Sequence, residues 1–441
     1  MQRNRTKLRA GLRPGLRPKR ERGIVIVLVA VVMLFVVGAM AALSIDVVTL
    51  YTARSEAQLA ADAAALAGAR VLANSGATSD RTGTLLTSVE TIPGPASVVA
   101  TQVAEQNQVG GTYLTGANIT AISFGGSDYT NPTITVRVQV TTLPTFFARI
   151  WGKTQLTVGA SATAEAYNPS GARALGITDP VAPTCVKPWL LPNADPTSGT
   201  IIFHHNSGSI DVMSNLLGST QTMSLACNGG NCTPPPPLGV PNAWTYYPGD
   251  PGSFPSPTSA LPTCSQVPTP TPYQESIAGC IQTPISCNSA VNIDTSNYSA
   301  RNTETADAVN CLTHATNNRG DTVLPYPPVA PFQFVAGDDD PLVLAGALNG
   351  GADIMVSDSL VTVPVINVQG GSGLPCAGAP CPVQIIGFVQ LFLNPQGTAT
   401  PPSGQVNTTV INLAGCGIGA IGTPIYGNGA SPVAVRLISP P

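Results

Sequence analysis

Gly23-Ile-Val-Ile-Val-Leu-Val-Ala-Val-Val-Met-Leu-Phe-Val-Val-Gly-Ala-Met-Ala-Ala-Leu43 contains no charged and no strongly polar side chain. A helix of about 20 residues rises about 30 Å, which is the thickness of the hydrocarbon core of a bilayer. The chain becomes more polar from Ser44 onward, yet no proline occurs from position 19 to position 92. We therefore predict one long helix over residues 23–73, whose first half spans a membrane and whose second half forms a stalk.

The stalk carries apolar and small residues at a seven-residue spacing. This spacing aligns them along one side of the helix, and small side chains allow another helix or a sheet to approach the backbone closely. Gly23 and Asp46 mark the two membrane boundaries. An alternative is that the alanine run only stiffens the stalk, because alanine is the best helix former. The helix-packing candidates are Leu50, Ala57, Leu59, Ala64, Leu66, Gly68 and Val71.

Several short motifs of this segment occur in a recognisable order. They are Arg22-Gly23, Ser44-Ile-Asp-Val47, Leu50-Tyr51, Arg54 and Leu59-Ala-Ala-Asp-Ala-Ala-Ala-Leu-Ala-Gly-Ala69. Together they resemble the N-terminal module of TadE/TadG-like proteins, which are associated with the tight-adherence (Tad/Flp) pilus system. The resemblance implies a membrane-anchored scaffold in pilus assembly or adhesion. It also implies partners among the other pilus-apparatus membrane proteins or pseudopilins, and self-association through the helix.

Residues 1–22 form a basic tail that holds nine of the twenty Lys and Arg residues and one acid, Glu21. A basic tail beside a membrane span follows the positive-inside rule, which predicts a cytoplasmic N-terminus in a bacterial inner membrane, with the remaining chain exported. We do not expect nucleic-acid binding. A cleaved signal peptide ending near Ala41 is an alternative. Pilin-like processing after Gly23 is another, although Leu28 stands where prepilins usually carry glutamate.

Composition and cysteine content agree with an exported chain. Charged residues make up only 10% of the 441 positions, while 44 glycines and 42 prolines favour a loop-rich β or α+β structure over a helical enzyme. Ten cysteines lie between positions 185 and 416, which is typical of an oxidising compartment. Turn-forming residues separate Cys227 from Cys232 and Cys376 from Cys381, so we predict two local disulfides. A Cys₄ zinc site is the alternative, but no Cys-x₂-Cys pair occurs.

Residues 96–167 are predicted to form a small α+β domain. A helix over 96–108 precedes strands at 118–124 and at 133–141, where apolar and polar residues alternate strictly. Next come a short helix over 144–151 and an alanine-lined strand over 156–166. The segment from Phe146 onward also resembles the outer domain that is commonly joined to a TadG-like anchor.

Residues 168–441 are predicted to form a disulfide-containing, β-rich region. Short strands are expected near 185–189, 199–205 and 208–213, and longer ones at 341–348, 360–368, 383–393 and 406–413. Residues 233–275 hold thirteen prolines, and we expect an irregular loop through which no continuous sheet passes. The predicted fold class is thus α+β: a transmembrane-plus-stalk helix, a small α+β domain, and this β-rich region.

No sequence motif indicates a catalytic or cofactor site. His204 and His205 are adjacent in a predicted strand and point to opposite faces, and His314 is the third histidine. Asp338-Asp-Asp340 lacks the spacing of a calcium loop and is expected to be a solvated turn. We predict no metal, no cofactor and no enzymatic activity. A pseudopilin subunit and a membrane-tethered exported hydrolase or binding protein are the alternatives.

Overall fold

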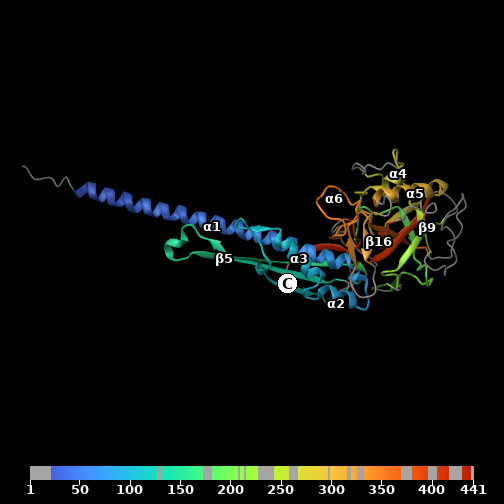
Figure 1. Ribbon diagram of the computed structural model, residues 1–441, viewed down its shortest axis with the longest axis horizontal. Helices are drawn as coiled ribbons and strands as arrows, with labels where there is room; N and C mark the ends of the chain where they lie inside the picture. The colour runs from blue at the N-terminus through green and yellow to red at the C-terminus, as the bar shows by residue number, and fades with distance from the viewer. Residues whose placement is uncertain are drawn as a thin grey trace, which may run out of the picture. The chain divides into compact units, whose positions relative to one another are not determined.

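The computed structural model describes residues 21–126, 129, 131–171, 181–206, 209–212, 215–226, 243–257, 267–295, 298–314, 319–324, 332–368, 380–395, 405–416 and 430–438. The chain divides into two compact units. The first comprises Met1–Ser55 and Val140–Val158, and the second comprises Glu56–Gln139 and Gly159–Pro441. The predicted α+β class is confirmed (Figure 1). The basic tail lies outside the described residues up to position 20.

The first element, α1, is an uninterrupted helix from Glu21 to Asn74, which confirms the long helix predicted from the apolar run. Residues 74–95 contain a 3₁₀ turn, η1 (Ala77–Ser79), and a short helix, α2 (Thr84–Glu90), which buries Leu85 and Val89. Helix α3 (Pro95–Glu105) follows, with proline in its first turn, where a missing N–H costs nothing. A two-stranded ribbon, β1 (Gln108–Val109) and β2 (Thr112–Tyr113), comes next.

A four-stranded sheet has the order β18-β5-β4-β3. Strand β4 (Thr133–Pro144) shows the predicted alternation, with Ile134, Val136 and Val138 buried. It lies between β3 (Ile119–Gly125) and β5 (Gln155–Tyr167). The edge strand β18 (Ala434–Ile438) pairs antiparallel with β5 and comes from the far end of the chain, which the sequence did not predict.

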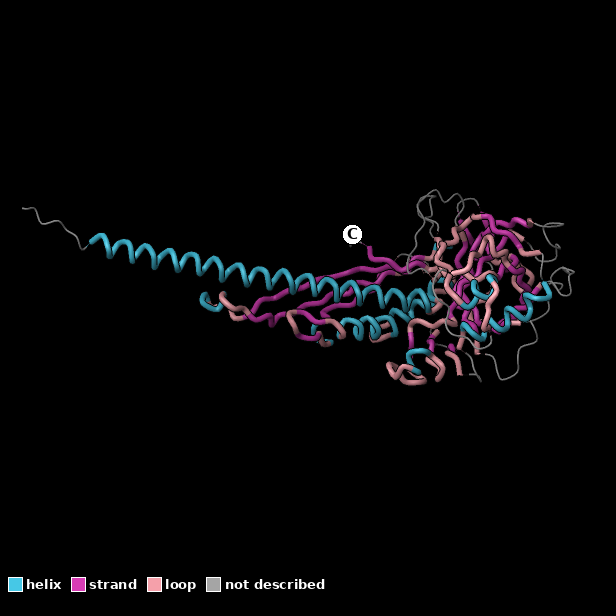
Figure 2. Tube along the Cα trace, turned by 90° about the horizontal axis from the view of Figure 1, so that it is seen from above, coloured by secondary structure: helices cyan, strands magenta, loops and turns pink. Residues whose placement is uncertain are grey.

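The helix predicted over 144–151 is wrong. Strand β4 continues to Pro144, and only Ala148–Trp151 forms a 3₁₀ turn, η3, before Gly152 turns the chain with φ 79°. Few residues separate β4 from β5, so the chain has room for one turn before it must reverse. We call residues 145–153 the hairpin tip. Figure 2 shows this reversal between long strands.

The largest sheet closes on itself. Its strand order is β11-β16-β15-β6-β10-β9-β17, and a further pairing of β16 with β17 completes a ring of six strands with β11 outside it. The predicted strands at 360–368, 383–393 and 406–413 correspond to β15 to β17. The bounds are β6 (Trp189–Pro192), β9 (Thr220–Leu225), β10 (Ala243–Pro248), β11 (Ala290–Ile293), β15 (Leu360–Ile366), β16 (Cys381–Leu393) and β17 (Val406–Gly415).

A cluster of buried side chains fills this barrel. Trp189, Trp244 and Met223 belong to it, together with alternate residues of β15 and β16, as the two-residue period of a strand requires. Helices α4 (Pro272–Ala278) and α5 (Tyr298–Leu312) contribute Tyr273, Val309 and their neighbours to the same cluster. Neither helix was predicted.

Two predictions for this region are wrong. Strand β10 lies inside the proline-rich segment and pairs with β6 and β9, because Ala-Trp-Thr-Tyr-Tyr-Pro carries proline only at its last position and leaves the ladder intact. The strand expected at 341–348 is instead a short helix, α6 (Pro341–Leu344). The carboxylate of Asp340 caps it by accepting hydrogen bonds from the N–H groups of Leu342 and Val343.

The remaining strands form small sheets. Strands β7 (Phe203–Asn206) and β8 (Ser209–Val212) form a hairpin, in the region where two short strands were predicted. Strands β12 (Thr322–Leu324), β13 (Gln333–Val335) and β14 (Asp353–Ile354) form a three-stranded sheet. Disulfides join Cys185 to Cys280 and Cys287 to Cys416, across 95 and 129 positions of sequence.

Candidate functional site

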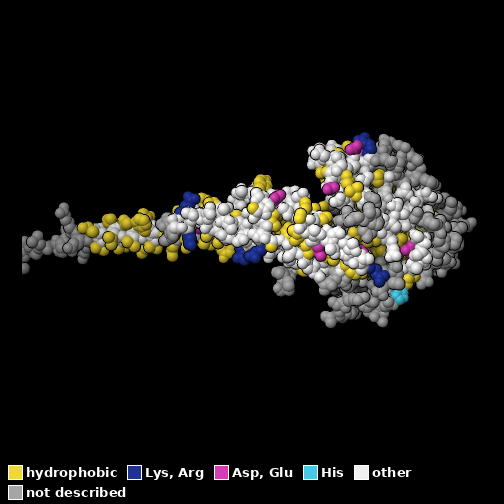
Figure 3. Space-filling view, turned by 60° about the horizontal axis from the view of Figure 1, so that its bottom comes forward, with side chains coloured by type: hydrophobic (Ala, Val, Ile, Leu, Met, Phe, Trp, Pro, Cys, Tyr) yellow, Lys and Arg dark blue, Asp and Glu magenta, His cyan; other side chains and the backbone are white. Residues whose placement is uncertain are grey.

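Within the part of the chain that the structure describes, the first half of α1 makes no packing contact that buries it. Every residue from Ile24 to Ala41 is exposed, including Leu34 and Phe35, each 73% exposed. This segment is long and apolar enough to cross a membrane, and hydrophobic side chains dominate its visible surface in Figure 3. Gly23, the predicted inner boundary, is exposed at its start. Such a surface is stable only in lipid or against other apolar surfaces.

Burial on α1 begins at Ala42 and Asp46, one helical turn apart, which are 5% and 6% exposed. The carboxylate of Asp46 accepts hydrogen bonds from the backbone N–H groups of the hairpin tip. The distances are 2.9 Å from Phe146, 3.1 Å from Phe147 and 2.7 Å from Ala148. Asp46 thus clamps a segment 100 residues further along the chain to the outer end of the apolar run.

These hydrogen bonds also set the ionisation of Asp46. The N–H of Phe146 lowers the pKa of the carboxyl group most, and the N–H groups of Ala148 and Phe147 act in the same direction. Desolvation raises the pKa but does not outweigh the three donors. Asp46 is therefore a charged acceptor at neutral pH, which is the form that binds N–H groups most strongly.

The second half of α1 is packed inside its own chain. The buried residues recur at three- and four-residue spacing, as expected for one face of a helix. Of the helix-packing candidates, Ala57, Ala64 and Gly68 lie on this face, Leu50, Leu66 and Val71 are half-buried, and Leu59 is 63% exposed. The buried face consists of Ala53, Ala57, Ala60, Ala61, Ala64, Ala65, Gly68, Ala69 and Leu72.

Gly68 lies at a close approach on this face. A Cβ atom placed there would lie 2.5 Å from Cδ1 of Ile134 on β4, 3.3 Å from the carbonyl oxygen of Ala96 and 3.4 Å from Cβ of Ala100 on α3. Near the C-terminal end of α1, the side-chain amide of Asn412 donates to the carbonyl oxygen of Ala73 at 2.6 Å. The small residues of the stalk therefore admit the sheet, α3 and the barrel of the same chain.

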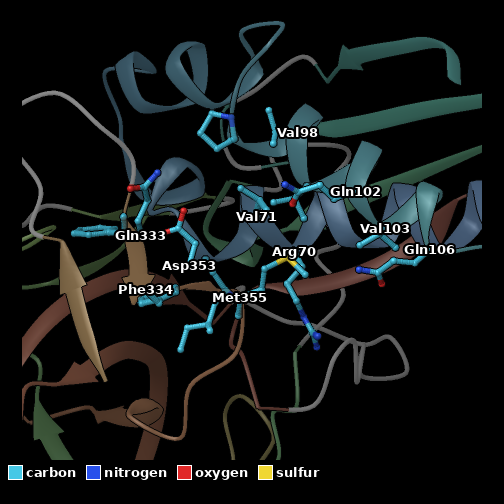
Figure 4. A pocket seen from close by; sticks show the side chains of 15 residues that line it. Arg70, Val71, Val98, Gln102, Val103, Gln106, Gln333, Phe334, Asp353 and Met355 are labelled. Carbon is cyan, nitrogen blue, oxygen red and sulfur yellow. Dashed lines mark hydrogen bonds between the residues drawn. The ribbon is translucent and has the colours of Figure 1, made fainter. Parts of the chain in front are cut away.

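A cleft of about 590 Å³ lies beside this part of α1 (Figure 4). Its described lining comes from α1, α3 and the β13–β14 region, and Arg70 and Asp353 are its two charged residues. Side-chain amides and apolar groups make up the rest, and the described lining contains no Ser, Cys, His or Lys. This lining suits the binding of a mixed polar and apolar segment better than nucleophilic catalysis.

The other polar candidates serve structural roles. His314 lies 3.3 Å from the carboxylate of Asp358, which raises the pKa of the imidazole by hydrogen bonding. Asp338 and Asp339 lie 3.7 and 3.5 Å from Arg319, and Asp340 caps α6. Within the described residues, no three His, Cys, Asp or Glu side chains are grouped to hold a metal ion.

The predicted local disulfides fall mostly outside the described residues. Cys227, Cys232 and Cys376 are not among them, whereas Cys381 is buried in β16 and disulfide-bonded. The two pairings that the structure describes involve cysteines to which no partner could be assigned from sequence.

Residues 23–71 match the family described as "Putative Flp pilus-assembly TadE/G-like". The chain carries a TadE/G-like module. This module coincides with the apolar span, Asp46 and most of the buried face of the stalk, so the chain is a membrane-anchored protein related to pilus assembly. No curated protein and no solved structure matches the chain.

The hydrogen-bond partners of Asp46 could not be identified from sequence. Asp46 was predicted as a membrane boundary because it follows the apolar run, and that signal is local. Its three donors are backbone N–H groups, which every non-proline residue has, so no residue type in the hairpin tip identifies them.

Proposed function

We propose that this TadE/G-like chain is a single-pass inner-membrane component of a Tad-type pilus apparatus, with a cytoplasmic N-terminus and exported domains that act as a scaffold or surface contact. The observation that carries the proposal is the contrast within α1. Residues 24–41 are exposed throughout, whereas the stalk beyond Ala53 packs within its own chain. The apolar half is therefore the part of the helix left for lipid and for helices of other apparatus proteins.

The small residues of the span give such partners a place to approach. Gly38 has no atom of the described residues within 4 Å of the position that a Cβ would occupy, in contrast to Gly68. Close helix contacts in lipid depend on small residues, because van der Waals packing replaces the hydrophobic effect there. Self-association through the same surface belongs to this proposal.

Site-specific photocrosslinking in intact cells tests this assignment. A photoreactive residue at Val36, 47% exposed, should give adducts with membrane proteins of the pilus apparatus, identified by mass spectrometry, or with a second copy of the chain. The same residue at Ala60, fully buried, serves as the matched control and should give no such adduct. Adducts restricted to lipid at every exposed position of the span would contradict the helix-contact role.

Topology is tested separately. Protease added to spheroplasts should degrade the chain beyond Leu43 and leave an N-terminal tag protected. Cleavage of the tag would overturn the orientation. N-terminal sequencing of the mature protein distinguishes the pseudopilin alternative, since a start at Ile24 would support a processed subunit and an intact tail supports the anchor.

We also propose a non-catalytic role for the exported domains. The composition of the cleft supports it, since the described lining offers amides and one ion of each sign without a nucleophile. Screening the purified full chain with ester, peptide and glycoside substrates should give no turnover. Activity that disappears on Arg70→Ala or Asp353→Ala would favour the hydrolase alternative.

A further inference from the structure

The hairpin tip presents two exposed cations and an exposed aromatic ring. Phe146 is 63% exposed, and Arg149 and Lys153 are exposed as well. No acidic residue occurs anywhere between positions 140 and 158, although residues 23–441 as a whole hold twenty-two acids against eleven basic residues. The tip is therefore a positively charged, partly apolar surface on a chain that is otherwise acidic.

The tip is held in one conformation by its own hydrogen bonds. The hydroxyl of Thr145 donates to the carbonyl oxygen of Lys153 at 2.5 Å, and the N–H of Lys153 donates to the carbonyl oxygen of Ala148 at 3.1 Å. Gly152 adopts the left-handed conformation that closes the turn. Together with the Asp46 clamp, these bonds fix where Phe146, Arg149 and Lys153 stand relative to α1.

The clamp places the tip at the edge of the membrane span. Asp46 follows Leu43 by three residues, which is about 4.5 Å along a helix. The polar headgroup layer on each side of the hydrocarbon core is about 5–8 Å thick. Burial on α1 starts at Ala42, within the last turn of the apolar run. The residues that Asp46 holds therefore lie at the depth of the headgroups.

We propose that the hairpin tip docks on the phospholipid headgroups around α1, with Arg149 and Lys153 on anionic phosphates and Phe146 in the interface. Phenylalanine is among the apolar residues that interfacial segments bury at the boundary between headgroups and acyl chains, and guanidinium and ammonium groups bind phosphate. The membrane then contacts the chain at two places, the span and the tip. A second contact restrains the rotation and tilt of α1 in the membrane, whereas anchoring by the span alone does not. The inference rests on α1 being the membrane anchor.

A set of tryptophan reporters, introduced one at a time, tests the depth of the tip. Full-length protein with Trp151→Phe is reconstituted with brominated phospholipids, which quench nearby tryptophan; Trp189 and Trp244, 0% and 1% exposed, give a constant background. Leu43→Trp reports the membrane edge, and Ser55→Trp, about 18 Å further along α1 and exposed, reports solvent. Phe146→Trp should be quenched at least half as strongly as Leu43→Trp.

The reporters separate the two ways of failing. Quenching of Phe146→Trp no stronger than that of Ser55→Trp, with Leu43→Trp quenched, would overturn the docking of the tip and leave the anchor intact. An unquenched Leu43→Trp would overturn the anchor itself.

Charge reversal tests the phosphate contact. Arg149→Glu with Lys153→Glu should reduce quenching of the Phe146→Trp reporter at least twofold in anionic vesicles, and replacing anionic by zwitterionic lipid should do the same to the unreversed protein. The matched control is Arg54→Glu, an exposed cation on α1 that lies beyond the headgroup layer. Quenching that responds to neither charge nor lipid composition would overturn the phosphate assignment, as would an equal response to Arg54→Glu.

Discussion

Gly68 and Ile134 should be energetically coupled, because they meet where the stalk packs on the sheet. A Cβ atom at Gly68 would lie 2.5 Å from Cδ1 of Ile134, which is too close for two carbon atoms. Ile134 is fully buried and cannot leave the core. In Gly68→Ala, overpacking of this kind costs about 2 kcal/mol, while replacing a helical glycine by alanine returns about 1 kcal/mol. The net loss of stability is about 1 kcal/mol.

Ile134→Val removes Cδ1, the atom in conflict. Alone, it leaves a small cavity and costs about 1 kcal/mol. In combination with Gly68→Ala, the overpacking is removed, and the helical gain of about 1 kcal/mol offsets the cost of Ile134→Val, so the double variant should be about as stable as the wild type. The coupling energy is then about 2 kcal/mol, within the range for residues in contact.

Hydrogen exchange of the β4 amides, measured on the reconstituted full chain, reports the differences in the free energy of unfolding of the domain that contains β4. Because about 1.4 kcal/mol corresponds to a factor of ten, additive behaviour would make the double variant exchange about thirtyfold faster than coupled behaviour. Gly38→Ala is the matched control on the same helix, since no atom in the described ranges lies within 4 Å of its Cβ position. Additivity of the two substitutions, or an equal effect of Gly38→Ala, would refute the packing argument.

Three further outcomes follow from polar and covalent contacts. Asp46→Asn should speed hydrogen exchange of the backbone amides at 146–148 several-fold at pH 7. In the wild type, the protection of these amides should persist until the pH falls through the lowered pKa of Asp46, below 3.8. Equal protection in both proteins would contradict the clamp. Burial lowers the pKa of Lys187 to about 7, so above this pH the unfolded chain binds a proton that the folded chain does not. The free energy of unfolding of the barrel should therefore increase as the pH rises from 7 toward 9.5, by at most about 1.4 kcal/mol per unit. Lys187→Met should flatten this slope in denaturant titrations. Replacing both Cys287 and Cys416 by alanine should cost about 2–5 kcal/mol, because the bond closes a long loop, and an unchanged guanidinium midpoint would contradict this.

Local periodicity carried most of what could be predicted from the sequence. The apolar run and the absence of proline specify α1, and the alternation in β4 specifies a strand with one buried face. Charge placement predicted the orientation of the chain, with a cytoplasmic N-terminus, without reference to any contact. These signals are properties of neighbouring residues, and secondary structure responds to neighbouring residues first.

Local reading failed where short segments depend on their surroundings. Residues 243–248 are a barrel strand inside a proline-rich segment, and residues 341–344 form a helix in an apolar run that resembles a strand. Pairing with the neighbouring strands β6 and β9 decides the first case, and the capping carboxylate of Asp340 decides the second. Residues 144–151 have helical spacing, but the hairpin they connect leaves room for one turn only.

The sequence by itself determined that this protein has a helix long and apolar enough to cross a bilayer and that this helix continues as a stalk, since twenty apolar residues have no stable place in water. Only the tertiary structure decided which distant segments of the chain pair with one another and which of them α1 binds. The pairing of β18 with β5, the closure of β16 on β17 and the reach of Asp46 to the hairpin tip each join positions that are far apart along the chain or depend on backbone groups common to all residues. Such contacts are selected by the packing of the whole fold, because no single residue type at either end is needed to make them.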